Sequence, residues 1–298
     1  MNNTLFNLYK NSEEFQSWPL KETVFLDTIY GKHKNDINNE TKVIEYEINN
    51  EVIGFISCKV RDRKGVITFI FIKKEYRGNG IGTNLIKQSI DWFKTKGVKE
   101  IVFGAGSGSY IFPGLPKNLN IENFFKKNDF NVSDTGLVDM YQDITNWSAD
   151  NNIFKKIYEK GIIIKYSNET VADKIIDFSK ENFPNWYEYY KKDMEEKNFD
   201  KVFYAAIDNE IVGISNLWIG DCTWDLLFES NVGGGGALGV SEKHRGQGIG
   251  IAMKTWGTQR IKEKGIKYIW IGWTYAIDFY KKLGFKVWRE YLKVKMSF

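Results

Sequence analysis

The alternation of apolar and polar residues predicts two β-hairpins of the same design, one in each half of the chain. In residues 42–60, two strand-like runs flank Asn49-Asn50. In residues 202–217, two similar runs flank Asp208-Asn209. Asn and Asp tolerate the positive φ that a two-residue hairpin turn requires, so both pairs are expected to be turns.

After each hairpin come an apolar run, a glycine-rich segment, a helical pattern and a further buried strand. The apolar runs are residues 66–72 and 237–240. The helical patterns follow from apolar residues spaced three or four apart. These are Ile86, Ile90 and Phe93 in the first half, and Ile249, Met253 and Trp256 in the second. Gly97 and Gly265 are expected to end the two helices, and the strands that follow are residues 101–103 and 268–271.

The repeated order of elements predicts two domains, residues 1–148 and 149–298, divided near a polar stretch. The second is expected to open with a strand at 161–165 and a helical region at 171–196. Strands and helices in this order indicate an α/β fold of the α+β kind.

Composition narrows the class of protein. The chain has 298 residues, is 42% hydrophobic, and carries a net charge of +4 from 42 basic and 38 acidic residues mixed along it. This predicts two folded cores and argues against a nucleic-acid partner. Cys58 and Cys222 belong to no disulfide or metal motif, so no metal is expected. Since the sequence shows neither a secretory leader nor a long apolar span, we expect a cytoplasmic protein without a membrane partner.

The glycine-rich segments are residues 76–82, YRGNGIG, and residues 244–250, HRGQGIG. Each lies between a strand and a helix, where backbone N–H groups can surround an anion. Neither has the Lys-Ser/Thr pair of a Walker loop, and the preceding antiparallel hairpins and GxGxG spacing do not suit a Rossmann fingerprint. What remains is Arg-x-x-Gly-x-Gly as a phosphate-binding loop.

This motif resembles the pyrophosphate loop of the GNAT acyl-CoA N-acyltransferases. The resemblance covers both halves, and includes Leu238-x-Val240 upstream and residues 279–285, FYKKLGF, downstream. It implies two GNAT-fold domains, each a mixed, mostly antiparallel sheet flanked by helices. It also implies acetyl-CoA as the acyl donor and cytosolic transfer to the primary amine of a small molecule, by direct attack in a ternary complex.

The resemblance further implies which residues contact acetyl-CoA. In the second half they are Leu238, Gly239, Val240, Arg245, Gly246, Gln247, Gly248, Ile249, Gly250 and, after the next strand, Thr274. In the first half they are Ile70, Ile72, Arg77, Gly78, Asn79, Gly80, Ile81 and Gly82. The N–H at Leu238 would polarise the thioester carbonyl. A hydroxyl held within its own turn is the alternative for Thr274.

The two halves differ at the position of the family's general acid. Tyr280 stands there in the second half and Phe125 in the first, so the second domain is expected to be catalytic and the first degenerate. The first domain keeps its loop for ligand binding, and Tyr110 is a candidate acid on its inserted segment.

The acceptor side is less defined. Asp225 and Glu229 are candidates for removing the proton of the amine, with solvated loop carboxylates as the alternative. The aromatic stretch 183–190 either lines an acceptor cavity or packs a helix onto the sheet. Two other functions stay open: a non-catalytic acyl-CoA sensor, and an acyltransferase for longer acyl groups or protein acceptors. The sequence does not predict an oligomeric state.

Overall fold

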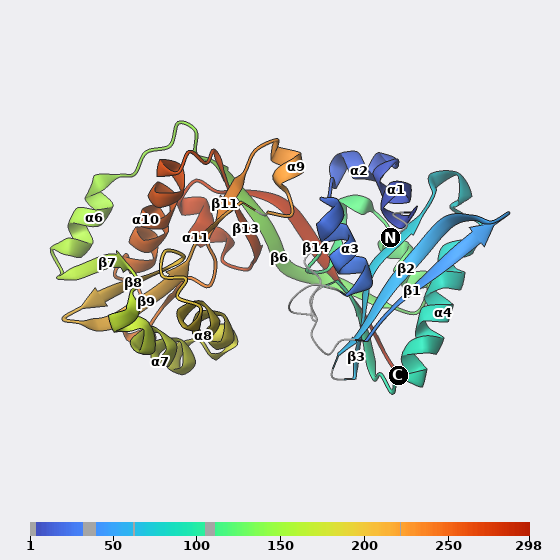
Figure 1. Cartoon of the computed structure of the whole chain (residues 1–298), viewed down its shortest axis with the longest axis horizontal. Coiled ribbons are helices and arrows are strands. Elements are labelled where there is room, and N and C mark those ends of the chain that lie inside the picture. The colour runs from blue at the N-terminus through green and yellow to red at the C-terminus, as the bar shows by residue number, and fades with distance from the viewer. Residues whose placement is uncertain (1–3, 32–39, 62, 105–110, 221) are drawn as a thin grey trace. The chain divides into compact units, whose positions relative to one another are not determined.

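The computed structural model describes residues 4–31, 40–61, 63–104, 111–220 and 222–298. The chain folds into two compact units, Met1–Val138 with Trp288–Phe298, and Asp139–Val287. These units differ from the predicted division at 148 and 149, because the chain's last residues belong to the first unit. Strands β6 (Asn131–Asp143) and β14 (Lys286–Ser297) therefore each contribute to both units (Figure 1).

The first unit contains a mixed, mostly antiparallel sheet. Its strands are β1 (Glu40–Ile48), β2 (Glu51–Arg61), β3 (Lys64–Ile72), β4 (Glu100–Phe103) and the first-unit part of β14, with the short β5 (Leu115–Pro116) alongside. Neighbours pair antiparallel except β3 and β4, which run parallel over Lys64–Ile67. Beyond Ile67, the strand residues that the structure describes pair β3 with β2 and not with β4.

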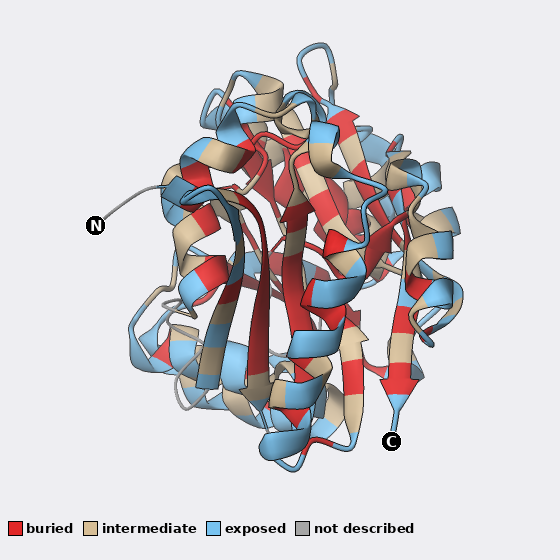
Figure 2. Cartoon of the chain, turned by 90° about the vertical axis from the view of Figure 1, so that its right-hand side faces the viewer, coloured by how far each residue is buried: buried red, intermediate tan, exposed pale blue. Residues whose placement is uncertain are grey.

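Helices pack on the sheet of the first unit. They are α1 (Thr4–Lys10), α2 (Glu13–Ser17), α3 (Glu22–Tyr30), α4 (Ile81–Thr95) and the short α5 (Glu122–Lys127). Tyr9 of α1 contacts the rings of Phe69 and Phe71 on β3, with centroids 5.2 and 5.8 Å away. Phe93 of α4 occupies the place where Gly65 lacks a Cβ, at 2.8 Å. Buried residues therefore follow the strands while the outer helix faces are exposed (Figure 2).

The return of β14 is fixed by side chains of the first unit. The Arg289 guanidinium lies 3.4 Å from the ring centroid of Trp18 and 3.8 Å from that of Trp288. Its Nη2 donates to the Ser17 carbonyl at 2.8 Å. Such stacked, hydrogen-bonded arginines hold their neighbours firmly. The strand is thus part of this unit's core.

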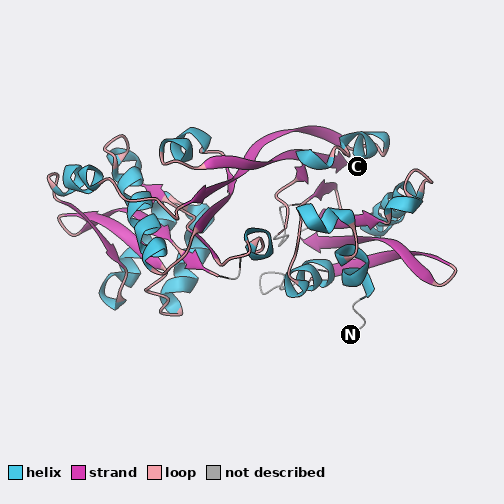
Figure 3. Ribbon diagram, turned by 90° about the horizontal axis from the view of Figure 1, so that it is seen from above, coloured by secondary structure: helices cyan, strands magenta, loops and turns pink. Residues whose placement is uncertain are grey.

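The second unit contains an antiparallel sheet of β7 (Ile162–Tyr166), β8 (Val202–Ile207), β9 (Glu210–Asn216) and β12 (Gly239–Val240). A separate group of strands comprises β10 (Trp218–Ile219), β11 (Val232–Gly234), β13 (Tyr268–Thr274) and the second-unit part of β6. Its helices are α6 (Asn151–Tyr158), α7 (Ala172–Asn182), α8 (Tyr187–Glu195), α9 (Asp225–Phe228), α10 (Ile249–Glu263) and α11 (Ile277–Lys282). Within this unit, helices lie on both sides of the strands (Figure 3).

Local predictions agree with these elements. Asn49 and Asn50 have φ of 51° and 63°, and Asp208 and Asn209 have 47° and 65°, which confirms both hairpin turns. Gly97 and Gly265, at 66° and 80°, follow α4 and α10 as expected. The helical region predicted at 171–196 is instead two helices, because Phe183, before Pro184, adopts φ −141° and ψ 61°. No helix in the described ranges is long and apolar enough to cross a membrane.

Candidate functional site

In the second unit, one stretch of chain leaves one sheet and joins another. Strand β11 pairs parallel with β13 at Val232–Gly234, and β12 pairs antiparallel with β9 at Gly239–Val240. Between them, residues 235–238 belong to neither ladder; we call this segment the strand junction. In the part of the chain that the structure describes, β12 and β13 belong to different sheets and are not paired with each other, so the strand junction separates two strand edges between which a ligand could bind.

The strand junction is held in an unusual conformation. Ala237 has φ of 47°, a region that residues with a Cβ seldom adopt. The Tyr190 hydroxyl donates to the Ala237 carbonyl at 2.6 Å, and Gly236 N–H donates to the Asn216 side-chain oxygen at 2.9 Å. Backbone held in sparsely populated conformations is concentrated at ligand-binding and catalytic sites. The strand junction is therefore a candidate site on geometry alone.

Strand β13, which the sequence places beside the cofactor strand, carries a second such residue. Trp273 has φ of 58°, and its N–H donates to the buried Asp139 carboxylate at 3.0 Å. The predicted cofactor contact Thr274 follows directly, but its hydroxyl accepts from the Ala276 N–H at 3.0 Å. That hydrogen bond corresponds to the alternative interpretation, a hydroxyl used within its own turn.

The second glycine-rich loop joins β12 to α10 and is open to anions. Gly246 and Gly248 have φ of 78° and 87°, and a Cβ on either would meet nothing within 4 Å. Glycine is thus needed here for its backbone conformation rather than for space. Gly248 caps α10 without a side-chain hydrogen bond, so the first N–H groups of this helix remain available for phosphate. Lys160 adds positive charge, since its Nζ donates to the Gln247 carbonyl at 3.3 Å.

The first loop has the same geometry. Gly78 and Gly80 have φ of 82° and 78°, and Gly80 caps α4 without a side-chain hydrogen bond. Arg77 Nε donates to the Ile72 carbonyl at 2.8 Å, and Arg245 Nε donates to the Val240 carbonyl at 3.2 Å. Both loops therefore present an arginine beside a helix N-terminus, an arrangement that can bind phosphate groups.

The loops differ in the charge that they offer. Arg77 Nη1 lies 2.7 Å from the Glu14 carboxylate in the first unit. Within the part of the chain that the structure describes, no carboxylate forms an ion pair with Arg245. The arginine of the second loop is thus the one whose charge is not already balanced.

Tyr280 is the fourth residue of α11 and is 7% exposed. It packs against Phe279 and Phe285, with ring centroids 5.1 and 5.4 Å away, and burial raises its pKa to about 12. No hydrogen bond joins its hydroxyl to another described residue. Phe125, the fourth residue of α5, is fully buried at the corresponding position of the first unit.

Sequence analysis missed Lys254, which lies close to Tyr280. It is the sixth residue of α10 and is only 4% exposed. Its Nζ lies 6.0 Å from the ring centroid of Tyr280 and 5.3 Å from that of Phe285. Burial lowers its pKa to about 7. The sixth residue of α4 is Ile86, so aligning the two halves shows a lysine where the first half has an apolar residue.

The Asp225 carboxylate is not placed at the strand junction. Asp225 is buried and its Oδ1 accepts from the Val232 N–H at 3.0 Å, at the opposite end of β11. Glu229 is exposed, just after α9. Phe183 packs against β12, its ring 2.4 Å from where a Cβ on Gly239 would lie, which matches the packing alternative for the aromatic stretch. Tyr110 lies outside the described residues.

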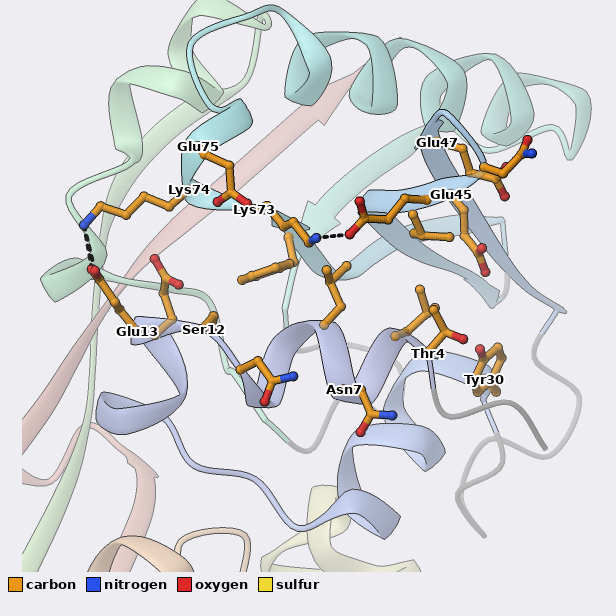
Figure 4. A pocket seen from close by; sticks show the side chains of 18 residues that line it. Thr4, Asn7, Ser12, Glu13, Tyr30, Glu45, Glu47, Lys73, Lys74 and Glu75 are labelled. Carbon is orange, nitrogen blue, oxygen red and sulfur yellow. Dashed lines mark hydrogen bonds and ion pairs between the residues drawn. The ribbon is translucent and has the colours of Figure 1, made fainter.

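A pocket of about 950 Å³ lies in the first unit, lined by α1, α2 and the ends of β1–β3 (Figure 4). Its charged side chains are partly paired across it, with Lys74 Nζ 2.7 Å from Glu13 and Lys73 bonded to Glu51. Burial and the neighbouring Glu47 raise the pKa of Glu45 at its rim. In the described ranges, no cluster of His, Cys, Asp or Glu suits a metal ion.

Comparison with known proteins supports both halves of the resemblance. The family model described as "Acetyltransferase (GNAT) family" matches residues 5–107 and 168–285. N-alpha-acetyltransferase 30 of Schizosaccharomyces pombe is 41% identical over 59 residues, 18% of this chain and 39% of that protein. The chain therefore spans well under half of this curated relative.

Solved structures match over nearly the whole chain. A GCN5-related glucosamine N-acetyltransferase region of a fungal multi-domain GH3 β-N-acetylglucosaminidase has a TM-score of 0.84 at 22% identity, covering 99% of this chain and 37% of that one. A tandem GNAT protein from the clavulanic acid biosynthesis pathway has a TM-score of 0.59 at 11% identity, covering 96% of both chains. These matches confirm the predicted fold, two domains each with a mixed sheet and flanking helices.

Proposed function

The chain belongs to the acetyltransferase (GNAT) family, and from this premise we propose that its second unit transfers an acetyl group from acetyl-CoA to a primary amine. One observation carries the proposal. The second unit combines a loop arginine without an ion-pair partner among the described residues, a strained strand junction and a buried tyrosine, whereas the first has Arg77 paired and Phe125 in place of that tyrosine.

Binding is assigned to the loop and the strand before it. The N–H groups at the start of α10, together with Arg245, would hold the pyrophosphate of acetyl-CoA. The pantetheine arm would lie along Leu238–Val240, next to the strand junction. In the described residues β12 pairs with β9 there, while β13 pairs with β11. The thioester supplies an electrophilic carbonyl, and an N–H at Leu238 would stabilise the negative charge that develops on its oxygen.

Tyr280 is assigned to the departing sulfur, as a hydrogen-bond or proton donor. Its hydroxyl forms no hydrogen bond to another described residue, and its ring packs against Phe279 and Phe285. The first unit offers the equivalent loop but a phenylalanine, which has no proton to give. We therefore propose that the first unit binds acyl-CoA weakly or not at all and does not turn it over.

The acceptor is proposed from the comparisons. The fungal structure is named as a glucosamine N-acetyltransferase region, so the amino group of an amino sugar is the first acceptor to test. The curated relative is named as an N-alpha-acetyltransferase, which makes a peptide with a free amino terminus the second.

Thiol release from acetyl-CoA tests the proposal directly. The purified chain is incubated with acetyl-CoA and either glucosamine, a peptide with a free amino terminus or buffer alone, and the acetylated product is identified by mass spectrometry. Amine-dependent thiol release supports the transferase. Thermal stabilisation by CoA without thiol release from any amine would favour the acyl-CoA sensor instead. Faster release from a longer acyl-CoA would favour the longer-acyl alternative.

A further inference from the structure

We propose that the Lys254 ammonium stabilises the departing CoA thiolate and supplies the proton that neutralises it, while Tyr280 orients the sulfur. This inference rests on the proposed acetyl transfer by the second unit. As the amine nitrogen bonds to the thioester carbon, the C–S bond breaks and its electron pair goes to sulfur. Lys254 gives one proton to that sulfur. The acceptor amine releases its own proton to solvent, and Lys254 then regains a proton from solvent.

The position of Lys254 places its charge at the strand junction. Its Nζ lies 3.6 Å from the position that a Cβ on Gly235, the first residue of the strand junction, would take. The rings of Tyr280 and Phe285 lie beyond it, at 6.0 and 5.3 Å. The same helix, α10, begins at the proposed pyrophosphate loop. One helix therefore presents both the phosphate-binding end of the donor site and the cation proposed for its sulfur end.

Lys254 lacks the partner that a buried cation normally has. No ion pair or hydrogen bond from its Nζ to any residue in the described ranges is present. The Tyr280 and Phe285 rings lie near it, and both its Nζ and the Asn216 carbonyl oxygen lie near the place that a Cβ on Gly235 would take, at 3.6 and 2.7 Å. Burying an unpaired ammonium is unfavourable, so such a group is retained where function requires it.

The first unit serves as an internal control for this argument. At the positions of Lys254 and Tyr280 it has Ile86 and Phe125, which are 1% and 0% exposed. The fold is thus satisfied by two apolar side chains at these places. Both polar groups occur together in the second unit, as expected if they act on the same atom.

The pKa values of the two groups support different roles for Lys254 and Tyr280. A thiol has an ordinary pKa near 8.5. Burial raises the pKa of Tyr280 to about 12, so its phenol is a weak acid toward a thiolate. Burial lowers the pKa of Lys254 to about 7, so its ammonium gives up a proton far more readily than the phenol does, while a thiolate beside it favours its charged form. Tyr280 then acts mainly through its hydrogen bond.

Ionisation of bound CoA tests this without any acceptor amine. CoA is titrated on the wild type, Lys254→Met and Lys281→Met, and the thiolate is followed by its ultraviolet absorbance. Lys281, exposed on α11, is the matched control. In the wild type and Lys281→Met, we expect bound CoA to ionise at least about one pH unit below free CoA, because a cation favours the thiolate. Lys254→Met should abolish that difference. Equal ionisation in the wild type and Lys254→Met overturns the inference.

Turnover gives a second readout. Since the protonated lysine is the active form, kcat of the wild type should fall as the pH rises above about 7. Lys254→Met should lower kcat at least about ten-fold, and its kcat should no longer fall as the pH rises above about 7. Its affinity for CoA should persist. If Lys254→Met changes neither kcat nor its fall above about pH 7, the role of Lys254 is contradicted, whereas the proposed acetyl transfer is not. Failure of the wild type to bind CoA at all would overturn the donor site itself and, with it, this inference.

Discussion

Arg77 and Glu14 form an ion pair of 2.7 Å in the first unit, and this pair distinguishes two glycine-rich loops of similar backbone geometry. The two loops share their local geometry. In each, the arginine Nε donates to the carbonyl five residues earlier, and the glycines have positive φ. The Glu14 carboxylate, on α2, competes with any phosphate that approaches Arg77. We therefore expect the loops to bind CoA unequally.

Arginine variants measure this inequality. Arg245→Gln should weaken CoA binding at least about ten-fold, because a charge-assisted contact to pyrophosphate is lost. Arg77→Gln should have a much smaller effect, and Glu14→Gln should strengthen binding to the first unit by no more than about five-fold, since half-exposed ion pairs contribute at most about 1 kcal/mol. Isothermal titration calorimetry with CoA gives both sites. Equal losses in the two arginine variants would show that the loops are equivalent.

Tyr280→Phe should lower kcat about ten-fold or more and leave CoA affinity nearly unchanged, because the substitution removes only the hydroxyl at the sulfur. The fold should tolerate it, since Phe125 occupies the same position in the first unit. Steady-state thiol release and calorimetry give the two quantities. Phe279→Leu, on the neighbouring position of α11, controls for repacking. Full turnover by Tyr280→Phe would remove Tyr280 from the proposed site.

Tyr190→Phe tests the support of the strand junction. Loss of the hydrogen bond to the Ala237 carbonyl should lower the free energy of unfolding by about 1–2 kcal/mol and reduce kcat. Burial raises the pKa of Tyr190 well above its ordinary value, so this donor stays protonated throughout the working pH range. Urea denaturation compares it with Tyr189→Phe, whose side chain is 59% exposed and which should change neither quantity. A loss of the same size in both variants would disconnect the effect from Ala237.

Lys254 should also make stability depend on pH. The pKa of this lysine is about 7 in the folded chain and ordinary in the unfolded chain, so between about pH 7 and 10 the unfolded chain holds more protons. The free energy of unfolding should therefore rise with pH over this window, by at most about 1.4 kcal/mol per unit. Lys254→Met should be more stable than the wild type at pH 7 and should lack this part of the rise. Denaturation at several pH values checks this, and parallel curves for the two proteins would contradict it.

Features set by neighbouring residues could be predicted from the sequence. The turns at Asn49-Asn50 and Asp208-Asn209 depend on local φ preferences, and the two glycine loops on spacing within a few residues. Features set by distant partners could not. Glu14 precedes Arg77 by 63 residues, and no local pattern indicates their pairing.

The burial of single polar residues could not be predicted from the sequence either. Lys254 occurs in a helix that also carries the half-buried Arg260 and Lys262 and the exposed Glu263, and a lone lysine in such a sequence ordinarily lies on the solvated face. Asp225 shows the reverse problem, because a carboxylate placed near the cofactor strand in sequence instead binds the backbone at Val232. Only the packing of each side chain separates these cases.

The assignment of Trp288–Phe298 to the first unit has a consequence for biosynthesis. This segment leaves the ribosome after the whole of the second unit, so the edge of β4 that it covers, and the Trp18 site that Arg289 fills, stay open until then during translation. An unpaired strand edge is prone to join other chains. The domain synthesised first is thus the one that completes its fold last.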